Sequence, residues 1–563
     1  MERKDSMNAK KNPIITLAVV LLCVTFTLSL TEALTEGSSP EEKHPLTVAE
    51  SSDYTATSRY ADVLSFIREL QSMSAYLKVE TMCTSPEGRD VPLLIIGNPL
   101  PSSTQDLHYD QRTVVYIQAN IHAGEVEGKE ASLMLARDIL LAEKMPYLDN
   151  LVILISPIFN ADGNEPISPE NRRNQVGPEQ GVGVRYNGQN LDLNRDGMKM
   201  ESPEIQGLVE NILNRWDPSL LVDCHTTNGS YHQQPVTYAW ILNPNGENSL
   251  IDYMRDKMMP EIDATLEKKY GYLSIPYGNF RNFKDPEAWM PSGPEPRYIT
   301  NYIGLRNRLA ILIENYAYAD YKTRVEGNYY FLHSILEFCS ANQDKINSLI
   351  AEADRKTILR GMGPTPLDTF IMEYDVRALD EPISILGWEM EAMQSDRGYP
   401  RMRKTDREKT YVLPYISDFF AKRSIQFPYG YFLTVPDQNI INNLLHHGIV
   451  VEKLLVPITL EVESFHPTEI TPSDRLYQGH HMNSIKGEYK IEEKEFPAGT
   501  YFIGTAQRLA NVAAYLLEAE SDDGLVVWNF FDRYLVPQWS RELPPYPVYR
   551  LLKPTPLVKE IIN

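Results

Sequence analysis

The chain has 563 residues, which is too long for one ordinary domain and predicts two large domains behind a leader. Hydrophobic residues make up 42% of it, enough for packed cores, and nothing in the composition indicates extensive disorder. The formal net charge of −22 argues against nucleic acid as a partner, because the phosphate backbone selects basic surfaces.

The N-terminus has the pattern of an export signal. Basic residues precede the uncharged stretch Ile14–Leu30, and small residues suitable for cleavage follow it at 31–33. We therefore expect a signal peptide over residues 1–33 and an exported protein, periplasmic or extracellular. A retained signal anchor is the alternative, because the stretch reaches the lower edge of a membrane span. Cleavage would leave no stable membrane insertion.

After the leader, a polar stretch over residues 34–54 predicts a linker. Near-continuous apolar strands then alternate with helices, which is typical of a sheet covered on both faces. We expect an α/β domain over residues 55–355, with a mixed, mostly parallel sheet flanked by helices. The predicted strands are Leu77–Cys83, Val91–Ile96, Thr113–Ile121, Leu151–Ile158, Leu220–Cys224 and Leu309–Ile313, and the helical segments are Tyr60–Leu70, Gly128–Ala142 and Tyr321–Ala353.

From about Pro364 the pattern changes to short alternating segments separated by turns. Ile458–Val462 and Tyr501–Ile503 predict antiparallel strands, while Gln438–His446 and Gln507–Leu517 predict helices. We expect a strand-rich α+β domain over residues 356–563, of unknown role. Cys83, Cys224 and Cys339 are too widely spaced for a disulfide framework, and Cys224 is expected to be a buried thiol.

Candidate metal ligands follow two of the predicted strands. His122 and Glu125 come directly after Thr113–Ile121, and His225 comes directly after Leu220–Cys224. Ligands in open α/β sheets bind outside the carboxyl ends of the strands, so these side chains can converge. Imidazole and carboxylate are good zinc ligands, and a catalytic site uses three of them with a fourth position open. The pattern predicts a His/Glu/His metal site.

Other polar residues offer the remaining chemistry. Glu314 closes a buried strand, where a carboxylate needs a partner or a task, such as accepting a proton from the attacking water. Arg195 can grip a carboxylate in a two-pronged contact beside the amide of Asn194. Asp192 can accept the second ring N–H of a ligand histidine. Arg172 and Arg173 are both candidates for stabilising an oxyanion.

Together these residues resemble the M14 family of zinc carboxypeptidases, over about residues 55–350. The resemblance rests on the order of Ser85-Pro-Glu-Gly-Arg-Asp-Val-Pro, His122-x-x-Glu125, Asn160-x-Asp-Gly163, Asp192-x-Asn-Arg195, His225 and Glu314. It extends to the larger exported bacterial branch of the family, in which a second domain follows the catalytic one.

The resemblance implies one Zn²⁺ per chain, bound by His122, Glu125 and His225. It implies that Glu314 is the general base and acid and that Arg172 is the oxyanion arginine, with Arg173 as the neighbouring possibility. Asn194 and Arg195 would hold the C-terminal carboxylate of a peptide or protein substrate.

The chain departs from the family pattern in two places. The usual Asn-Pro-Asp-Gly turn is Asn-Ala-Asp-Gly, and the mobile tyrosine of the active site has two candidates, Tyr298 and Tyr302. We take Tyr302 as the substrate-binding candidate. Loops within Thr237–Arg297 are expected to line the side-chain pocket.

The function implied is a zinc metallocarboxypeptidase that hydrolyses the C-terminal peptide bond. One alternative is a zinc amidase or deacylase that acts on cell-wall peptides or N-acyl amino acids. Another is a catalytically silent binding protein with the same fold.

Overall fold

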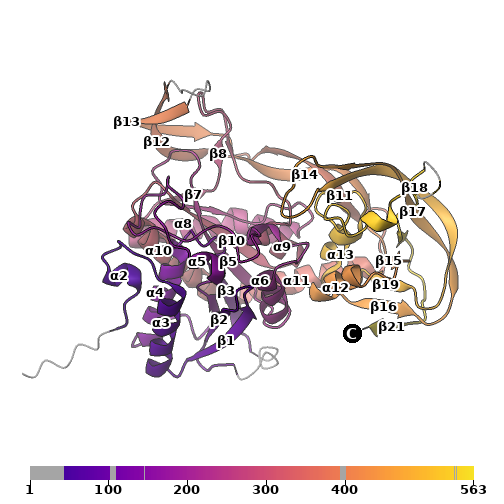
Figure 1. Ribbon diagram of the computed structural model, residues 1–563, viewed down its shortest axis with the longest axis horizontal. Coiled ribbons are helices and arrows are strands. Elements are labelled where there is room, and N and C mark those ends of the chain that lie inside the picture. The colour runs from indigo at the N-terminus through magenta and orange to yellow at the C-terminus, as the bar shows by residue number, and fades with distance from the viewer. Residues whose placement is uncertain are drawn as a thin grey trace, which may run out of the picture. The chain divides into compact units, whose positions relative to one another are not determined.

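The computed structural model describes residues 44–562, apart from 102–109, 145, 394–400, 538 and 540–541. The predicted signal peptide, residues 1–33, lies outside the described residues. Leu46–Asn563 form one compact unit (Figure 1). None of the helices in the described ranges has the length and apolarity needed to span a membrane.

A mixed sheet of eight strands forms the centre of the N-terminal part, residues 46–362, in the order β1-β2-β4-β3-β5-β10-β6-β7. Its middle strands β4, β3, β5 and β10 are parallel, whereas β1, β2 and β6 pair antiparallel with neighbours. The predicted mixed sheet is therefore confirmed. The strands are β1 (Leu77–Thr84), β2 (Asp90–Ile96), β3 (Thr113–Ala119), β4 (Leu151–Ser156), β5 (Leu220–Thr227), β6 (Val236–Ala239), β7 (Ser274–Pro276) and β10 (Leu309–Tyr316).

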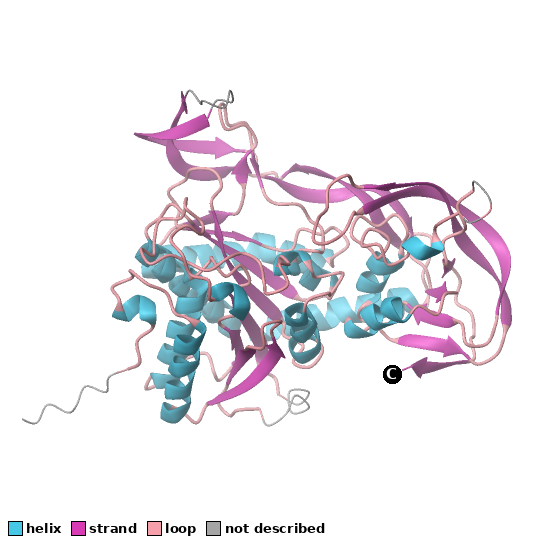
Figure 2. Ribbon diagram, in the orientation of Figure 1, coloured by secondary structure: helices cyan, strands magenta, loops and turns pink. Residues whose placement is uncertain are grey.

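Helices cover both faces of this sheet (Figure 2). Helices α4 and α10 pack on one face, and α6 and α9 contact strands from the other. The helical segments of this part are α2 (Val48–Ser51), α3 (Tyr60–Met73), α4 (Glu127–Leu141), α5 (Ala161–Asn164), η2 (Leu193–Arg195), α6 (Pro203–Gly207), η3 (Leu208–Leu213), α7 (Asn248–Tyr253), η4 (Met254–Met258), α8 (Met259–Thr265), η5 (Leu266–Tyr270), α9 (Ile299–Leu305), α10 (Tyr321–Ala341) and α11 (Gln343–Met362).

Close contact between α4 and β5 depends on a glycine. A Cβ atom at Gly128 would lie 2.3 Å from the Cβ of Cys224, so a larger residue would push the helix off the sheet. The Cys224 side chain lies under the helix and is buried, as predicted. Successive strand residues face opposite sides, so His225 points to the other face.

The structure adds detail to two predicted segments. The expected linker 34–54 contains the short helix α2, because Thr47 and Glu50 form a reciprocal capping box at its start. Glu50 also pairs with Arg137 of α4 at 2.7 Å, which fastens α2 to the sheet's helical layer. The stretch predicted to be mostly helical, Tyr321–Ala353, is helical and forms two helices, α10 and α11, separated at Asn342.

The C-terminal part, residues 363–562, is rich in strands, as predicted (Figure 2). A seven-stranded sheet in the order β18-β17-β20-β15-β19-β16-β21 is accompanied by the antiparallel pairs β11/β14 and β12/β13. Its elements are β11 (Thr369–Ala378), β12 (Ile383–Met393), β13 (Arg401–Leu413), β14 (Ile416–Gln426), β15 (Gly430–Leu433), α12 (Gln438–His446), β16 (Val451–Leu454), β17 (Ile458–Pro472), β18 (Asn483–Phe496), β19 (Tyr501–Gly504), α13 (Ala510–Leu517), η6 (Asp532–Tyr534), β20 (Val548–Leu551) and β21 (Lys559–Ile562).

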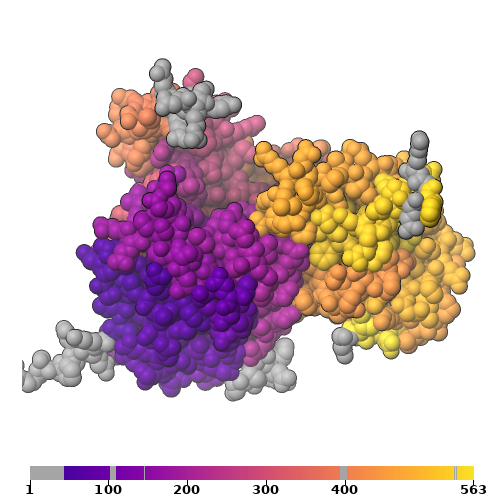
Figure 3. Space-filling model, in the orientation of Figure 1, coloured from indigo at the N-terminus to yellow at the C-terminus, as the bar shows by residue number. Residues whose placement is uncertain are grey.

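The two parts share an apolar core. One cluster of buried side chains includes strands of the N-terminal sheet together with Phe370, Tyr415 and Tyr515 of the C-terminal part. A smaller cluster around Phe432 and Phe496 lies within the C-terminal sheet. The surfaces of the two parts adjoin in the space-filling view, where purple meets orange and yellow (Figure 3).

Candidate active site

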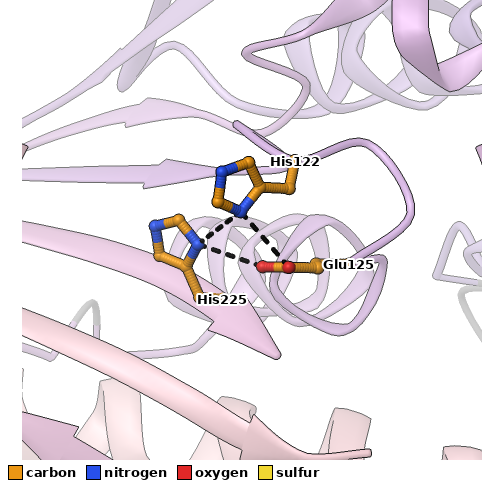
Figure 4. Close-up of side chains that lie close together, drawn as sticks. All are labelled: His122, Glu125 and His225. Carbon is orange, nitrogen blue, oxygen red and sulfur yellow. Dashed lines mark hydrogen bonds and ion pairs between the residues drawn. The ribbon is translucent and has the colours of Figure 1, made fainter. Parts of the chain in front are cut away.

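Three candidate metal ligands meet at the carboxyl ends of β3 and β5. His122 follows β3, Glu125 precedes α4, and His225 lies on β5 (Figure 4). The two Nδ1 atoms of the histidines are 3.1 Å apart, and the Glu125 carboxylate lies 3.2 Å from His122 Nδ1 and 3.0 Å from His225 Nδ1. All three side chains are buried. Their ligand atoms lie within 4.8 Å of one another, so one ion can contact all three.

A carboxylate lies behind each histidine. His122 Nε2 is 3.0 Å from Asp192 Oδ1, and His225 Nε2 is 2.8 Å from Asp223 Oδ2. If each Nε2–H faces a carboxylate, each Nδ1 offers its lone pair to the shared point. The sequence analysis named Asp192 but missed Asp223. Its signal is the two-residue spacing to His225 on a strand, which puts both side chains on one face.

The donor set fits zinc. Two neutral imidazoles and a carboxylate are the ligand types of catalytic zinc sites, and three protein ligands leave a fourth position for water or substrate. Two buried imidazole lone pairs aimed at one point beside a carboxylate are also costly without a cation or a proton between them. Burial alone raises the pKa of Glu125, but His122 and Arg172 hold that pKa well below its ordinary value. The ligand carboxylate is therefore ionised.

His122 and Glu125 line a cavity of about 360 Å³, and His225 contacts both of them. Glu314 lies in its wall on β10, directly opposite His225 in the register of the parallel strands. Burial raises the pKa of Glu314 to about 8, and the Glu125 charge adds to this, while His225 and Arg172 oppose it. A carboxyl group with a raised pKa beside a metal site is suited to accept and return a proton.

The structure separates the two candidate arginines. Arg172 donates to Glu125 Oε1 at 2.7 Å and to the Thr226 carbonyl at 2.9 Å. Its φ of +51° is unusual for a residue with a side chain and aims the guanidinium at the cavity. Arg173 also lines the mouth, but its side chain is 75% exposed and pairs with Glu170. Of the two arginines, Arg172 is therefore better placed to contact an oxyanion in the cavity.

A third arginine was not expected from the sequence. Arg185 lines the cavity, donates from Nε to Asp192 Oδ2 at 2.7 Å, and has NH1 3.7 Å from Glu125 Oε1. It belongs to no motif, and a lone arginine in a loop carries no signal in the sequence. Its charge helps to offset the carboxylates gathered around the ligands.

The predicted carboxylate anchor also lines the cavity. Asn194 Oδ1 accepts the backbone N–H of Ile299 at 2.9 Å, which fixes the side-chain amide. Arg195 donates from NH1 to the Asn194 carbonyl at 2.6 Å, and its guanidinium carbon lies 4.5 Å from the centre of the Tyr298 ring. Both residues therefore stand at the edge of the metal site with their side chains held by protein contacts.

Tyr302 does not reach this cavity. It is fully buried on α9, and its hydroxyl is 2.8 Å from Nδ1 of His447 in the C-terminal part. Two other tyrosines line the cavity, Tyr298 and Tyr277. Tyr277 lies in the segment Thr237–Arg297, and burial together with the Glu314 charge raises its pKa to about 12. The two side chains are four residues apart but share no helix face, because Tyr298 precedes α9 with an extended backbone whereas Tyr302 lies within α9 and is buried in the core.

The segment Thr237–Arg297 supplies other residues of the wall, as expected. A small set of apolar and neutral side chains adjoins the metal site from there and from β10: Ala239, Trp240, Leu242, Ser292 and Leu312.

Residues 63–239 match the family model described as zinc carboxypeptidase. Carboxypeptidase 2 of Trichophyton rubrum is 21% identical over 503 residues, which cover 83% of this chain and 84% of that protein. Carboxypeptidase 2 of Trichophyton equinum is 22% identical over 515 residues, covering 86% and 85%.

Among solved structures, the metallo-carboxypeptidase from Burkholderia cenocepacia is similar at 17% identity and a TM-score of 0.37, covering 50% of this chain and 69% of that one. The carboxypeptidase A from Helicoverpa armigera is 18% identical with a TM-score of 0.37, covering 59% and 80%. By the match to the family model, residues 63–239 form a zinc carboxypeptidase domain, and the chain is similar to curated carboxypeptidases over most of its length.

Proposed function

We propose that the protein is a zinc-dependent metallocarboxypeptidase that removes the C-terminal residue of peptides or proteins. One observation carries the proposal: the cavity lined by His122 and Glu125 of the His/Glu/His set is also lined by Glu314, whose pKa is raised, and by the Asn194–Arg195 anchor. One Zn²⁺ per chain would be held by His122, Glu125 and His225. When bound, zinc supplies Lewis-acid polarisation of the scissile carbonyl and lowers the pKa of a water molecule.

The residues of the chain take the remaining roles. Glu314 accepts the proton of the attacking water and returns it to the leaving amine. Arg172 gives its guanidinium to the developing negative charge on the carbonyl oxygen. Arg195 and Asn194 hold the terminal carboxylate, so that only the last peptide bond reaches the ligand set.

The role of Asp192 in this proposal is to orient His122. Burial raises the pKa of Asp192, but His122 and Arg195 lower it more strongly, so the carboxylate is ionised. An ionised carboxylate 3.0 Å from Nε2 keeps the proton on that nitrogen and leaves Nδ1 free for the metal.

The test compares peptides with a free C-terminus and the same peptides with a C-terminal amide. Loss of the carboxylate removes a two-pronged ionic contact, and we expect kcat/KM to fall by roughly 10- to 100-fold. Removal of zinc by a chelator should abolish release, and addition of zinc should restore it. Equal cleavage of free and amidated peptides would overturn the exopeptidase assignment and favour an amidase. Zinc binding without hydrolysis of any amide would identify a silent binding protein.

We also propose that the protein is exported and that its leader, residues 1–33, is cleaved. The sequence pattern of the leader supports this. The N-terminal sequence of the mature protein from the medium or periplasm tests it. A protein that starts at Met1 in the membrane fraction would show a retained anchor instead.

A further inference from the structure

The C-terminal part contacts two walls of the cavity. We define the anchor wall as residues 192–201, which carry Asn194 and Arg195, and the tyrosine wall as residues 277–293, which carry Tyr277 and Ser292. Both walls belong to the N-terminal part and line or support the cavity. In Figure 1, β8 (Asn279–Phe280), which belongs to the tyrosine wall, lies beside the β12/β13 hairpin of the C-terminal part.

The anchor wall is contacted by the loop 473–482, which joins β17 to β18. Gln478 Oε1 accepts the backbone N–H of Asp192 at 2.8 Å. Oδ1 of the same Asp192 lies 3.0 Å from Nε2 of His122, the candidate metal ligand. Asn194 follows Asp192 two residues later in the chain. Gln478 has φ of +51°, so the loop holds an unfavourable backbone conformation at the contact.

The same loop contacts the far end of the anchor wall. His480 Nε2 lies 2.9 Å from Glu201 Oε1, and Glu201 pairs with the buried Lys199 at 2.9 Å. Lys199 in turn pairs with Asp196 at 2.6 Å. The loop therefore joins an ion network that runs back along the wall toward Arg195.

A second segment of the C-terminal part fixes the chain beside this wall. Asp523 accepts the backbone N–H of Arg297 at 2.5 Å, and the Arg297 guanidinium lies over the rings of Tyr477 and Trp528. Arg297 directly precedes Tyr298, whose ring lies under Arg195. Both sides of the anchor are thus held from the C-terminal part.

The tyrosine wall is contacted by the turn between β13 and β14. The Tyr415 hydroxyl donates to the Tyr277 carbonyl at 2.9 Å, and the backbone N–H of Trp289 donates to the Pro414 carbonyl at 3.0 Å. Tyr415 is fully buried, so its hydroxyl has no water to replace this bond.

We propose that the strand-rich C-terminal part is a positioning component of the active site, with Gln478 and Tyr415 as positioning residues for the two walls. Neither side chain lines the cavity, so each acts through another residue. This inference rests on the proposed carboxypeptidase function. Catalysis in such a site is sensitive to shifts of less than an ångström in the groups that bind substrate. Loss of the Gln478 or Tyr415 contact would allow such a shift in the wall that it holds.

Two full-length variants test the proposal. Gln478→Met keeps the side-chain length but removes the acceptor, and Tyr415→Phe removes only the hydroxyl. We expect Gln478→Met to raise KM for peptides with a free carboxylate by roughly tenfold with little change in kcat and no loss of bound zinc. Tyr415→Phe should lower kcat/KM by a factor on the order of ten. Amide hydrogen exchange should become faster in the wall that each variant releases.

The structure offers a matched control for each variant. Leu476→Gln changes the same loop at a side chain that is 65% exposed, and it should leave KM and exchange unchanged. Tyr411→Phe removes a hydroxyl that donates to the Trp388 carbonyl within the β12/β13 hairpin, and it keeps the ring that packs on Phe280 of the tyrosine wall. It matches the loss in Tyr415→Phe without touching the cavity.

Unchanged KM and unchanged exchange in Gln478→Met, together with unchanged kcat/KM in Tyr415→Phe, would overturn the proposal. So would a fall in thermal stability with no change in kinetics or exchange, because it would show packing alone. A wild-type enzyme that releases no C-terminal residue would instead refute the proposed function. The exchange measurements on the two walls decide the positioning proposal in that case as well.

Discussion

Glu314 is the residue whose environment is best matched to proton transfer. Its carboxyl group lies in the cavity wall opposite His225, and burial raises its pKa to about 8. The Glu314→Gln variant keeps the shape and removes the proton acceptor. We expect kcat to fall by about 10²- to 10⁴-fold while bound zinc stays at one per chain. Metal analysis beside single-turnover kinetics checks this, and near-normal turnover would remove Glu314 from its role.

Arg172 and Arg173 are adjacent in the chain but differ in surroundings. Arg172 contacts Glu125 and the Thr226 carbonyl inside the cavity, whereas Arg173 is mostly exposed. Loss of one donor to a developing oxyanion costs about 10²- to 10³-fold in kcat. We therefore expect Arg172→Ala to lose kcat by that amount and Arg173→Ala to stay close to wild type. Comparable losses in both variants would contradict the assignment.

Much of this site is predictable at the level of single residues, because its main residues lie at or just after the ends of predicted strands. His122, Glu125, His225 and Glu314 each follow or close an apolar run, and such runs are visible in the sequence. Asp223, Arg185 and Tyr277 were missed for different reasons. Asp223 lies inside a buried strand, where its pairing depends on which face the strand presents. Arg185 and Tyr277 lie in loops whose course is decided by distant contacts.

At the scale of elements, α9 and α12 are joined by a buried neutral histidine. His447 follows α12, its Nδ1 is 2.8 Å from the Tyr302 hydroxyl, and its Nε2 is 3.1 Å from the Met198 carbonyl. Burial lowers the pKa of His447 to about 3, from an ordinary value of 6.5, and the positive charge of Arg306 acts in the same direction.

This histidine predicts a loss of stability in acid. In the unfolded chain His447 takes up a proton below pH 6.5, while in the folded protein it stays neutral down to about pH 3. Its contribution to the free energy of unfolding is therefore complete above pH 6.5 and decreases as the pH falls. Between these two pKa values, the free energy of unfolding decreases by up to about 1.4 kcal/mol for each pH unit of acidification.

Denaturant unfolding at several pH values between 7 and 4 tests this. The His447→Gln variant should lose part of the wild-type slope. The neighbouring His446→Gln is the control, because that side chain is 37% exposed. If the free energy of unfolding changes equally with pH in the wild type and in His447→Gln, the buried ring does not cause the loss of stability in acid.

The elements themselves were predicted with unequal success. Helix α12 has the predicted bounds, and strand β4 begins at the predicted Leu151 but ends at Ser156, two residues before the predicted Ile158; both carry strong local patterns. The pairs β11/β14 and β12/β13 were not predicted, because their strands are largely exposed and lack a regular apolar face. Helix α2 was missed because four residues give too short a pattern, although its capping box was present in the sequence.

On the scale of the whole molecule, the shared core decides how the chain unfolds. The division into domains at about residue 355 stays a prediction, but one apolar cluster includes residues from both sides of it. Tyr302 and Arg306 of the N-terminal part also bond to His447 of the C-terminal part. A chain that ends at residue 355 would expose this surface to water.

We therefore expect the truncated chain to be poorly soluble and the full chain to unfold in a single cooperative transition. Calorimetry of the full chain, with and without zinc, and expression of residues 34–355 check the two statements. A stable, soluble fragment with a sharp transition of its own would contradict this prediction.

The contact between Asp192 and Gln478 joins residues 286 positions apart, and that between Tyr277 and Tyr415 joins residues 138 apart. A ribosome releases a chain from its N-terminus, so the candidate metal ligands and Glu314 emerge well before Gln478 and Tyr415. If these two residues position the walls, a partly made chain carries every candidate reacting group but lacks the contacts that hold the anchor wall and the tyrosine wall. We therefore expect full activity only after the C-terminal part has folded onto both walls.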